Sequence, residues 1–168
     1  MKGKIFLSGG GGFKKTYDFD RIFLRNIKSI LYIPIAWKNN NFKECLKWFK
    51  SMLKAHKKKT TVEMLTGLSK NIELNNYDAI YIGGGNTFKL LKKIKDSKFD
   101  KKLLEYYKKG GIIYGGSAGA IIWGNDINIA KICKDADVNK VMLKNTKGVN
   151  LLKNLDFPAQ PKGRGFRL

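Results

Sequence analysis

Short apolar runs alternate along this chain with longer segments in which apolar residues recur at helical spacing. The strand-like runs are residues 4–8, 29–36, 60–65, 78–82 and 112–114, and the helix-like segments are 17–27, 42–55, 88–94 and 99–109. Such alternation predicts right-handed βαβ units, and therefore an α/β fold with a mainly parallel, doubly wound sheet and helices on both faces. Ligands of these sheets bind beyond the carboxyl ends of the strands.

After Trp123 the pattern changes to shorter pieces. Residues 126–132 and 140–143 are predicted strands, separated by an acidic turn at 135–137. We expect one domain over residues 1–157, incomplete at its carboxyl end, and an atypical tail at 158–168. The tail holds two of the three prolines and two of the four arginines. A change of reading frame, a truncation or a non-native end is the favoured interpretation of the tail, and an independent flexible segment is the alternative.

The pattern G-x-S-x-G stands at residues 115–119, between two apolar runs. This is the strand-to-helix context of a nucleophile elbow, a tight turn that exposes a serine above a sheet. Ser117 is therefore the candidate nucleophile. The N–H of Ala118, at a helix N-terminus, is a candidate donor to an oxyanion. Packing alone also places small residues at such turns, and this alternative stays open.

A second glycine turn, Gly83-Gly84-Gly85, directly follows the apolar run 78–82. Asn86 or Thr87 is suited to cap the helix that comes next. Because both glycine turns follow predicted parallel strands, we expect them to share one crevice, with the second turn supplying another oxyanion donor. A glycine-rich connection that binds nothing is the alternative.

The formal net charge is +21, a value that is often associated with nucleic-acid binding. The basic residues are 30 lysines and 4 arginines, and most lysines lie on the predicted polar faces of helices. Because abundant Lys and Asn with little Arg is the product of an AT-rich coding sequence, a solvated lysine surface is favoured and nucleic acid is an unlikely partner. The dense run at residues 56–59 keeps a nucleic-acid hypothesis open.

Cysteines and hydropathy indicate a cytoplasmic protein without a membrane span. Cys45 and Cys133 stand alone, with no histidine nearby, so they are interpreted as free thiols, and neither a disulfide nor a metal site is indicated. No apolar stretch of about 18 residues is present, and the amino-terminal apolar run is too short for a signal peptide.

Two further features carry less weight. The run GGGGFKKT at residues 9–16 is similar to a phosphate loop, but Lys14 stands where glycine should precede Lys-Thr, so nucleotide binding is not favoured and no cofactor is expected. His56 is the only histidine of the chain and is expected to be a solvated side chain among lysines. Nothing in the sequence places His56 beside Ser117, although a serine nucleophile needs a base.

Five segments of the chain are informative together: KIFLSGGG at 4–11, ILYIPIAW at 30–37, YIGGGNTFKLL at 81–91, YGGSAGAIIWG at 114–124 and DADVNKVMLKNTKGVNLL at 135–152. These segments resemble the dipeptidase E (aspartyl dipeptidase)/cyanophycinase family of serine peptidases. The resemblance implies a fold like that of class I glutamine amidotransferases.

The resemblance also implies site residues. Ser117 corresponds to the nucleophile, Asp137 to the triad acid with Asp135 as the alternative, and oxyanion and substrate-binding groups are Gly84, Gly85, Asn86 and Ala118. The family places its catalytic histidine shortly after the segment equivalent to 150–157, where this chain has Pro-Ala-Gln-Pro instead.

These features predict a serine hydrolase of small peptides with an acidic N-terminal residue, impaired because the triad histidine is missing. The expected partners are a small peptide substrate and, in a homodimer, a second copy of the chain; no membrane partner is expected. A family remnant without activity and a lysine-rich nucleic-acid-binding protein are the alternatives.

Overall fold

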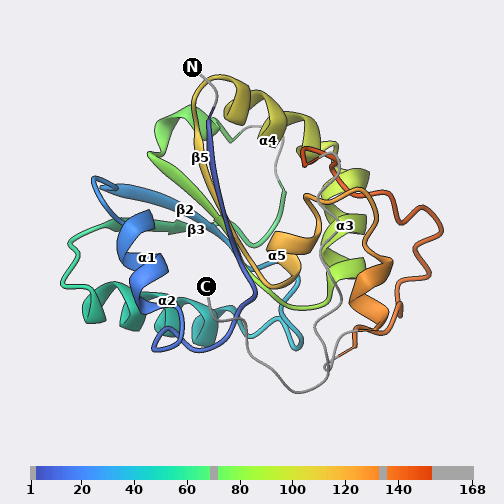
Figure 1. Ribbon diagram of the computed structural model, residues 1–168, viewed down its shortest axis with the longest axis horizontal. Helices are drawn as coiled ribbons and strands as arrows, with labels where there is room; N and C mark the ends of the chain where they lie inside the picture. The colour runs from blue at the N-terminus through green and yellow to red at the C-terminus, as the bar shows by residue number, and fades with distance from the viewer. Residues whose placement is uncertain (1–2, 69–71, 133–135, 153–168) are drawn as a thin grey trace.

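Five parallel strands form one sheet in the order β1-β5-β4-β2-β3 in the computed structural model, which describes residues 3–68, 72–132 and 136–152 (Figure 1). The strands are β1 Lys4–Ser8, β2 Ser29–Ile33, β3 Thr61–Met64, β4 Ala79–Ile82 and β5 Ile112–Gly116. Every pair of neighbouring strands is parallel, which confirms the predicted sheet. The order places β5 and β4, which precede the two glycine turns, side by side at the centre.

Helices cover both faces of the sheet, as expected for a doubly wound fold (Figure 1). The α-helices are α1 Tyr17–Phe23, α2 Phe42–Ala55, α3 Thr87–Asp96, α4 Phe99–Lys108 and α5 Ala118–Ile121, and two 3₁₀ turns lie at Leu74–Asn76 and Asn128–Lys131. Helices α1 and α2 lie on one face, and α3, α4 and α5 lie on the other. No helix in the described ranges is long and apolar enough to cross a membrane.

Each face of the sheet has its own apolar core, because successive strand residues point to opposite faces. Leu31, Ile80 and Ile113 face the core beneath α3, α4 and α5. The residues beside them in sequence, such as Ile30 and Tyr81, face the core beneath α1 and α2. Strands buried on both faces explain why the sequence shows apolar runs rather than alternation.

A row of aromatic rings crosses the sheet on the α1–α2 side. Phe6, Tyr114, Tyr81 and Tyr32 are register partners on four adjacent strands. The rings of Tyr81 and Tyr114 stack with centroids 4.3 Å apart. From α2, the ring of Phe49 stacks on Tyr32 at 4.4 Å and meets Tyr81 edge-on at 4.8 Å. This row fixes α2 to the sheet.

The predicted strands after Trp123 are wrong. Residues 128–131 form a 3₁₀ turn, and Asp126 makes only an isolated antiparallel bridge with Lys147. The Asp126 carboxylate accepts the N–H of Asn128 and so turns the chain, which a strand does not allow.

Residues 140–143 are not a strand either. The Asn139 side chain accepts the N–H of Leu143 and donates to its carbonyl, and thus occupies both groups that a sheet ladder would need. The hydrogen bonds of the Asn139 side chain therefore prevent the strand that the apolar pattern of this segment predicts. The predicted tail at 158–168 lies outside the described residues.

Replacing Phe49 by alanine should lower the free energy of unfolding by about 3–5 kcal/mol, because a fully buried ring in the aromatic row is lost. Urea unfolding followed by circular dichroism measures the change. Lys47→Ala, on the exposed side of the same helix, is the matched control and should change stability by less than about 0.5 kcal/mol. Equal losses in the two variants would contradict the role assigned to the row.

Candidate active site

Ser117 occupies a strained turn between β5 and α5. Its backbone angles are φ 52° and ψ −115°, a positive φ that few non-glycine residues adopt. Such a conformation costs about 1–3 kcal/mol and persists only where the surroundings impose it. The Ser117 N–H donates to the carbonyl of Ser8 at the end of β1, at 2.8 Å. Ser117 is the one residue between Ile113 and Ala120 that is not buried, as a nucleophile elbow requires.

The two glycines of the G-x-S-x-G pattern allow this turn to form. A Cβ on Gly115 would overlap the carbonyl of Gly119, and a Cβ on Gly119 would overlap the carbonyl of Ile82. The strand β5, the short helix α5 and the end of β4 therefore meet backbone to backbone. The two glycines thus permit the close approach of these elements.

The second glycine turn lies directly beside Ser117. A Cβ on Gly84 would stand 3.1 Å from the Ser117 Cβ and 3.6 Å from its Oγ. Gly85, with φ +127°, packs against the carbonyl of Ala36, where no side chain would fit. The expected juxtaposition of the two turns is thus present.

The helix that follows this turn is capped as predicted. Asn86 precedes α3, and its side-chain oxygen accepts the N–H of Lys89 at 2.9 Å. The Lys89 ammonium in turn donates to the carbonyl of Trp37 and to the side chain of Asn40, each at 3.0 Å. Burial of this ammonium lowers the pKa of Lys89. These contacts fix the loop after β2 against the start of α3.

The glycine loop after β1 forms a third wall of the site, which sequence reasoning missed. Gly10, with φ +85°, lies against Ser117, because a Cβ on Gly10 would stand 2.9 Å from the Ser117 Cβ. The Gly10 N–H donates to the Ser8 hydroxyl at 3.3 Å. The run of four glycines was weighed only as a phosphate loop. Its position after the strand next to β5 was the signal that could have placed it here.

Asp137 reaches the same region from the far end of the chain. Its carboxylate accepts the backbone N–H of Thr87 at 2.8 Å and the Thr87 hydroxyl at 2.6 Å. Next to it, the Asn86 side chain donates to the Val138 carbonyl at 2.9 Å. Asp137 is therefore attached to the first turn of α3, three residues after Gly84. The alternative acid, Asp135, lies outside the described residues.

His56 lies away from this cluster of loops. It caps the carboxyl end of α2, and its ring stacks on Tyr17 of α1 with centroids 4.3 Å apart. Both ring nitrogens are buried, with no hydrogen-bond partner among the described residues. The expectation of a solvated side chain is therefore wrong, because Tyr17 covers the ring. Burial lowers the pKa of His56, and the nearby charge of Asp20 opposes that shift.

A buried carboxyl group supports the turn from the α1 side. Asp20 is 3% exposed and accepts hydrogen bonds from the Thr16 hydroxyl at 2.6 Å and the Tyr114 hydroxyl at 2.7 Å. Burial raises the pKa of Asp20, and these two bonds partly offset the shift. Because Tyr114 precedes Ser117 by three residues on β5, this pair connects α1 to the strand that carries the candidate nucleophile.

Metal ligands do not gather around these loops. Within the described ranges, no group of three or more His, Cys, Asp or Glu side chains could hold a metal ion. Cys45 is a buried free thiol in the core beneath α2.

The parallel sheet and the strained serine turn define an α/β protein with the geometry of a nucleophile elbow, and comparison with known proteins gives its family. The model of Peptidase family S51 matches residues 5–163, and this chain belongs to that family.

Among curated proteins, an uncharacterised peptidase of Listeria monocytogenes is 40% identical over 100 residues, which cover 59% of this chain and 43% of the relative. Peptidase E of Haemophilus influenzae is 31% identical over 134 residues, which cover 76% of this chain and 61% of the relative. The chain thus spans less than two thirds of the length of either relative.

Solved structures show the same fold. The crystal structure of a Listeria monocytogenes protein assigned as a Peptidase E superposes with a TM-score of 0.74 at 28% identity, over 91% of this chain and 77% of that one. A peptidase from an actinobacterium superposes with a TM-score of 0.67 at 17% identity, over 92% and 66% of the two chains.

Replacing Gly10 by alanine should destabilise the protein by about 1–3 kcal/mol, because the position needs a positive φ and the new methyl group would press on Ser117. Thermal unfolding and limited proteolysis of the loop measure the effect. Gly12→Ala is the control in the same loop. Gly12 has open space around it and no positive φ, so its replacement should be neutral or stabilise by about 0.4–1 kcal/mol. Equal stability of the two variants would contradict the close packing of the Gly10 loop against Ser117.

Proposed function

We propose that this chain carries the nucleophile and the oxyanion donors of a serine peptidase site for small peptides. The observation that carries the proposal is the strained Ser117 turn at the carboxyl edge of a parallel sheet, in contact with the Gly84 turn. A positive φ at a partly exposed serine would be selected against if the turn served packing alone, because glycine would relieve the strain.

In this reaction the Ser117 Oγ attacks the carbonyl carbon of the scissile peptide bond, and its proton passes to a base. The new C–O bond places a negative charge on the former carbonyl oxygen. The N–H of Ala118 is among the first of α5, and the first N–H groups of a helix have no partner inside it. The N–H groups of the Gly84-Gly85 turn, held by Asn86, supply the second set of donors. When this intermediate collapses, the C–N bond breaks, the base returns its proton to the leaving nitrogen, and the amine departs. The acyl-serine that remains is hydrolysed by water.

Asp137 is the candidate acid of the catalytic triad. Its attachment to Thr87 holds the carboxylate at the start of α3, beside the Gly84 turn. Such an acid orients a histidine and stabilises the imidazolium that forms when the serine loses its proton. Asp135 remains the alternative.

We infer that the 168 residues hold no histidine base for Ser117. His56 is the only histidine of the sequence, and it stacks on Tyr17 between α1 and α2. We therefore infer that the 168-residue chain cleaves peptides slowly, because loss of a triad member costs several orders of magnitude in rate. The same observation supports the second candidate, a family member without turnover.

The proposed substrates are dipeptides with an acidic first residue. Support comes from the similarity to Peptidase E and from the net charge of +21, which attracts acidic peptides. The free thiol of Cys45 fits a reducing cytoplasm as the site of action.

Assay of Asp-X dipeptide hydrolysis tests the nucleophile. The 168-residue chain should show slow turnover at most, and Ser117→Ala should remove whatever Ser117-dependent turnover is present. A second form, in which a family-like segment with the histidine and following strands replaces residues 158–168, should cleave at least about a hundredfold faster. Robust cleavage by the 168-residue chain that depends on Ser117 would overturn the missing-base proposal, and cleavage that survives Ser117→Ala would overturn the nucleophile.

The role of Asp137 as the triad acid is tested in the second form, which carries the family-like segment with the histidine. Asp137→Asn should lower kcat by about 10²–10⁴-fold, because the amide cannot stabilise an imidazolium. Thr87→Val removes the hydroxyl that donates to the Asp137 carboxylate and keeps the negative charge of Asp137. This variant therefore controls for the loss of the attachment between Asp137 and α3. Similar kcat values for the two variants would show that Asp137 only holds α3 in place.

A further inference from the structure

A continuous row of lysines covers the solvent side of α2 and the turn after it. The row consists of seven residues, which we call the lysine face: Lys43, Lys47, Lys50, Lys54, Lys57, Lys58 and Lys59. The four on α2 recur at three- and four-residue spacing, so they lie on one side of the helix. At 1.5 Å per residue they extend over roughly 16 Å.

The lysine face differs from the lysines of the other layer in its counter-charges. On α3 and α4, Lys92 pairs with Asp96 at 2.8 Å, and Lys109 pairs with Glu105 at 2.7 Å. Within the part of the chain that the structure describes, no ion pair involves the lysine face.

The acidic residues on α2 and on the neighbouring strand β3 do not neutralise the lysine face. Glu44 in the first turn is the only acidic residue of α2. Glu63, on the neighbouring strand β3, accepts a hydrogen bond from the Tyr77 hydroxyl instead. A coding bias toward lysine raises the number of lysines everywhere, but it does not by itself place seven of them along one helix and the turn after it with one acidic residue among them.

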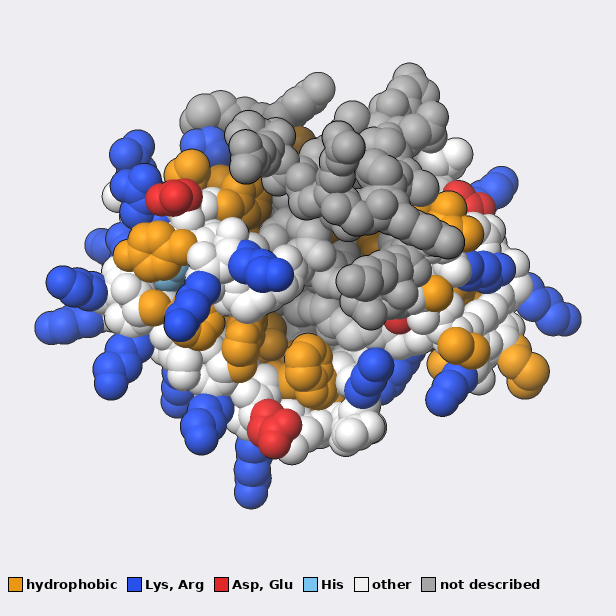
Figure 2. All heavy atoms as spheres, turned by 60° about the horizontal axis from the view of Figure 1, so that its bottom comes forward, with side chains coloured by type: hydrophobic (Ala, Val, Ile, Leu, Met, Phe, Trp, Pro, Cys, Tyr) orange, Lys and Arg blue, Asp and Glu red, His pale blue; other side chains and the backbone are white. Residues whose placement is uncertain are grey.

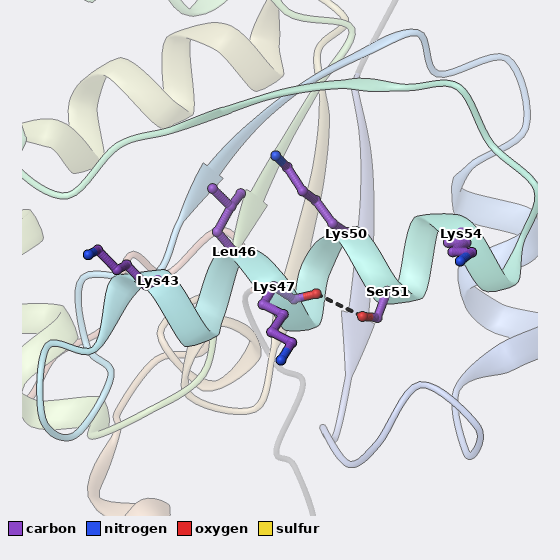
Figure 3. A pocket seen from close by; sticks show the side chains of 6 residues that line it. All are labelled: Lys43, Leu46, Lys47, Lys50, Ser51 and Lys54. Atoms are coloured by element: carbon purple, nitrogen blue, oxygen red, sulfur yellow. Dashed lines mark hydrogen bonds between the residues drawn. The ribbon is translucent and has the colours of Figure 1, made fainter.

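Two adjoining shallow hollows run along the lysine face. The first lies on α2 between the stems of four lysines, with Leu46 and Ser51 between them (Figure 3). The second continues past Lys57 to Thr60 and Val62 on the edge strand. In the view that brings the lower side of Figure 1 forward, basic side chains project widely and acidic ones are few (Figure 2). The hollows and the lysine side chains that line them lie on the same side of α2.

We propose that the lysine face binds the phosphate backbone of nucleic acid without sequence preference. Like charges at four-residue spacing destabilise a helix, and an external polyanion removes that repulsion. One strand of a duplex advances about 3.4 Å per phosphate, so the part of the lysine face on α2 alone faces roughly five phosphates. Lysine binds phosphate as a point charge, and contacts to phosphate carry no sequence information directly. This inference does not rest on the proposed peptidase activity.

Other polyanionic partners fit the surface less well. A helix that lies on a membrane presents large apolar side chains beside its lysines. On α2, Phe49, Met52 and Leu53 are buried in the protein core, and Trp48 packs partly buried against it. A protein partner would need a central apolar or aromatic anchor, and the hollows are lined mainly by lysine stems.

Fluorescence anisotropy with short labelled DNA duplexes of two unrelated sequences tests the proposal. The 168-residue chain should bind both with equal affinity, and log K should fall linearly with log salt. The variant K43Q/K47Q/K50Q/K54Q should bind at least about tenfold more weakly at low salt, and its salt slope should be shallower by about 3–4. Glutamine retains good helix propensity, so α2 should stay folded, as circular dichroism will show.

A charge-matched control distinguishes binding at the lysine face from an effect of the net charge. The variant K101Q/K108Q/K140Q/K144Q also removes four positive charges, but from exposed positions outside the lysine face. Its affinity for DNA should fall less than about threefold, and its slope of log K against log salt should change little. Equal losses in the two variants would overturn the proposal, as would undetectable DNA binding by the unmodified chain at low salt. Tighter binding to anionic lipid vesicles or to polyglutamate than to DNA would also overturn it.

Discussion

The arrangement of the site depends on one close contact, the backbone packing of α5 on the ends of β4 and β5. Gly119 rests on the carbonyl of Ile82, and Gly115 rests on Gly119 itself. With no side chain between them, the helix begins immediately after the strand, and the connecting residue has no room for a relaxed conformation. Ser117 therefore takes a positive φ and rises partly into solvent while its neighbours are buried. A larger residue at either glycine would separate the elements and remove the strain.

Parallel pairing explains why three loops meet at this serine. The strand order places β1 and β4 on the two sides of β5, and all three strands point the same way. The loops that leave them must therefore emerge at one edge, with Gly10 on one side of Ser117 and Gly84 on the other. The bond from the Ser117 N–H to the Ser8 carbonyl and the Asp20–Tyr114 pair hold the β1 side of this arrangement.

The lysines of the two helical layers differ in their ion pairs. In the layer with α3 and α4, Lys92, Lys95 and Lys109 have ion-pair partners, and Lys89 donates hydrogen bonds. The outer side of α2 carries the lysine face with no ion-pair partner in the described ranges. The net charge does not show which lysines have ion-pair partners, because it sums over both layers.

The sequence by itself determined the parallel α/β fold, the elbow at Ser117 and the cap at Asn86, because apolar periodicity and glycine turns act over a few neighbouring residues. It failed at 126–132 and 140–143, where the side chains of Asp126 and Asn139 take up backbone groups and exclude a strand. Only the tertiary structure decided which distant segments meet: the Gly10 loop against Ser117, Asp137 on Thr87, and Tyr17 over His56. These contacts join residues far apart in the chain, and strand order and helix packing set them rather than any local pattern.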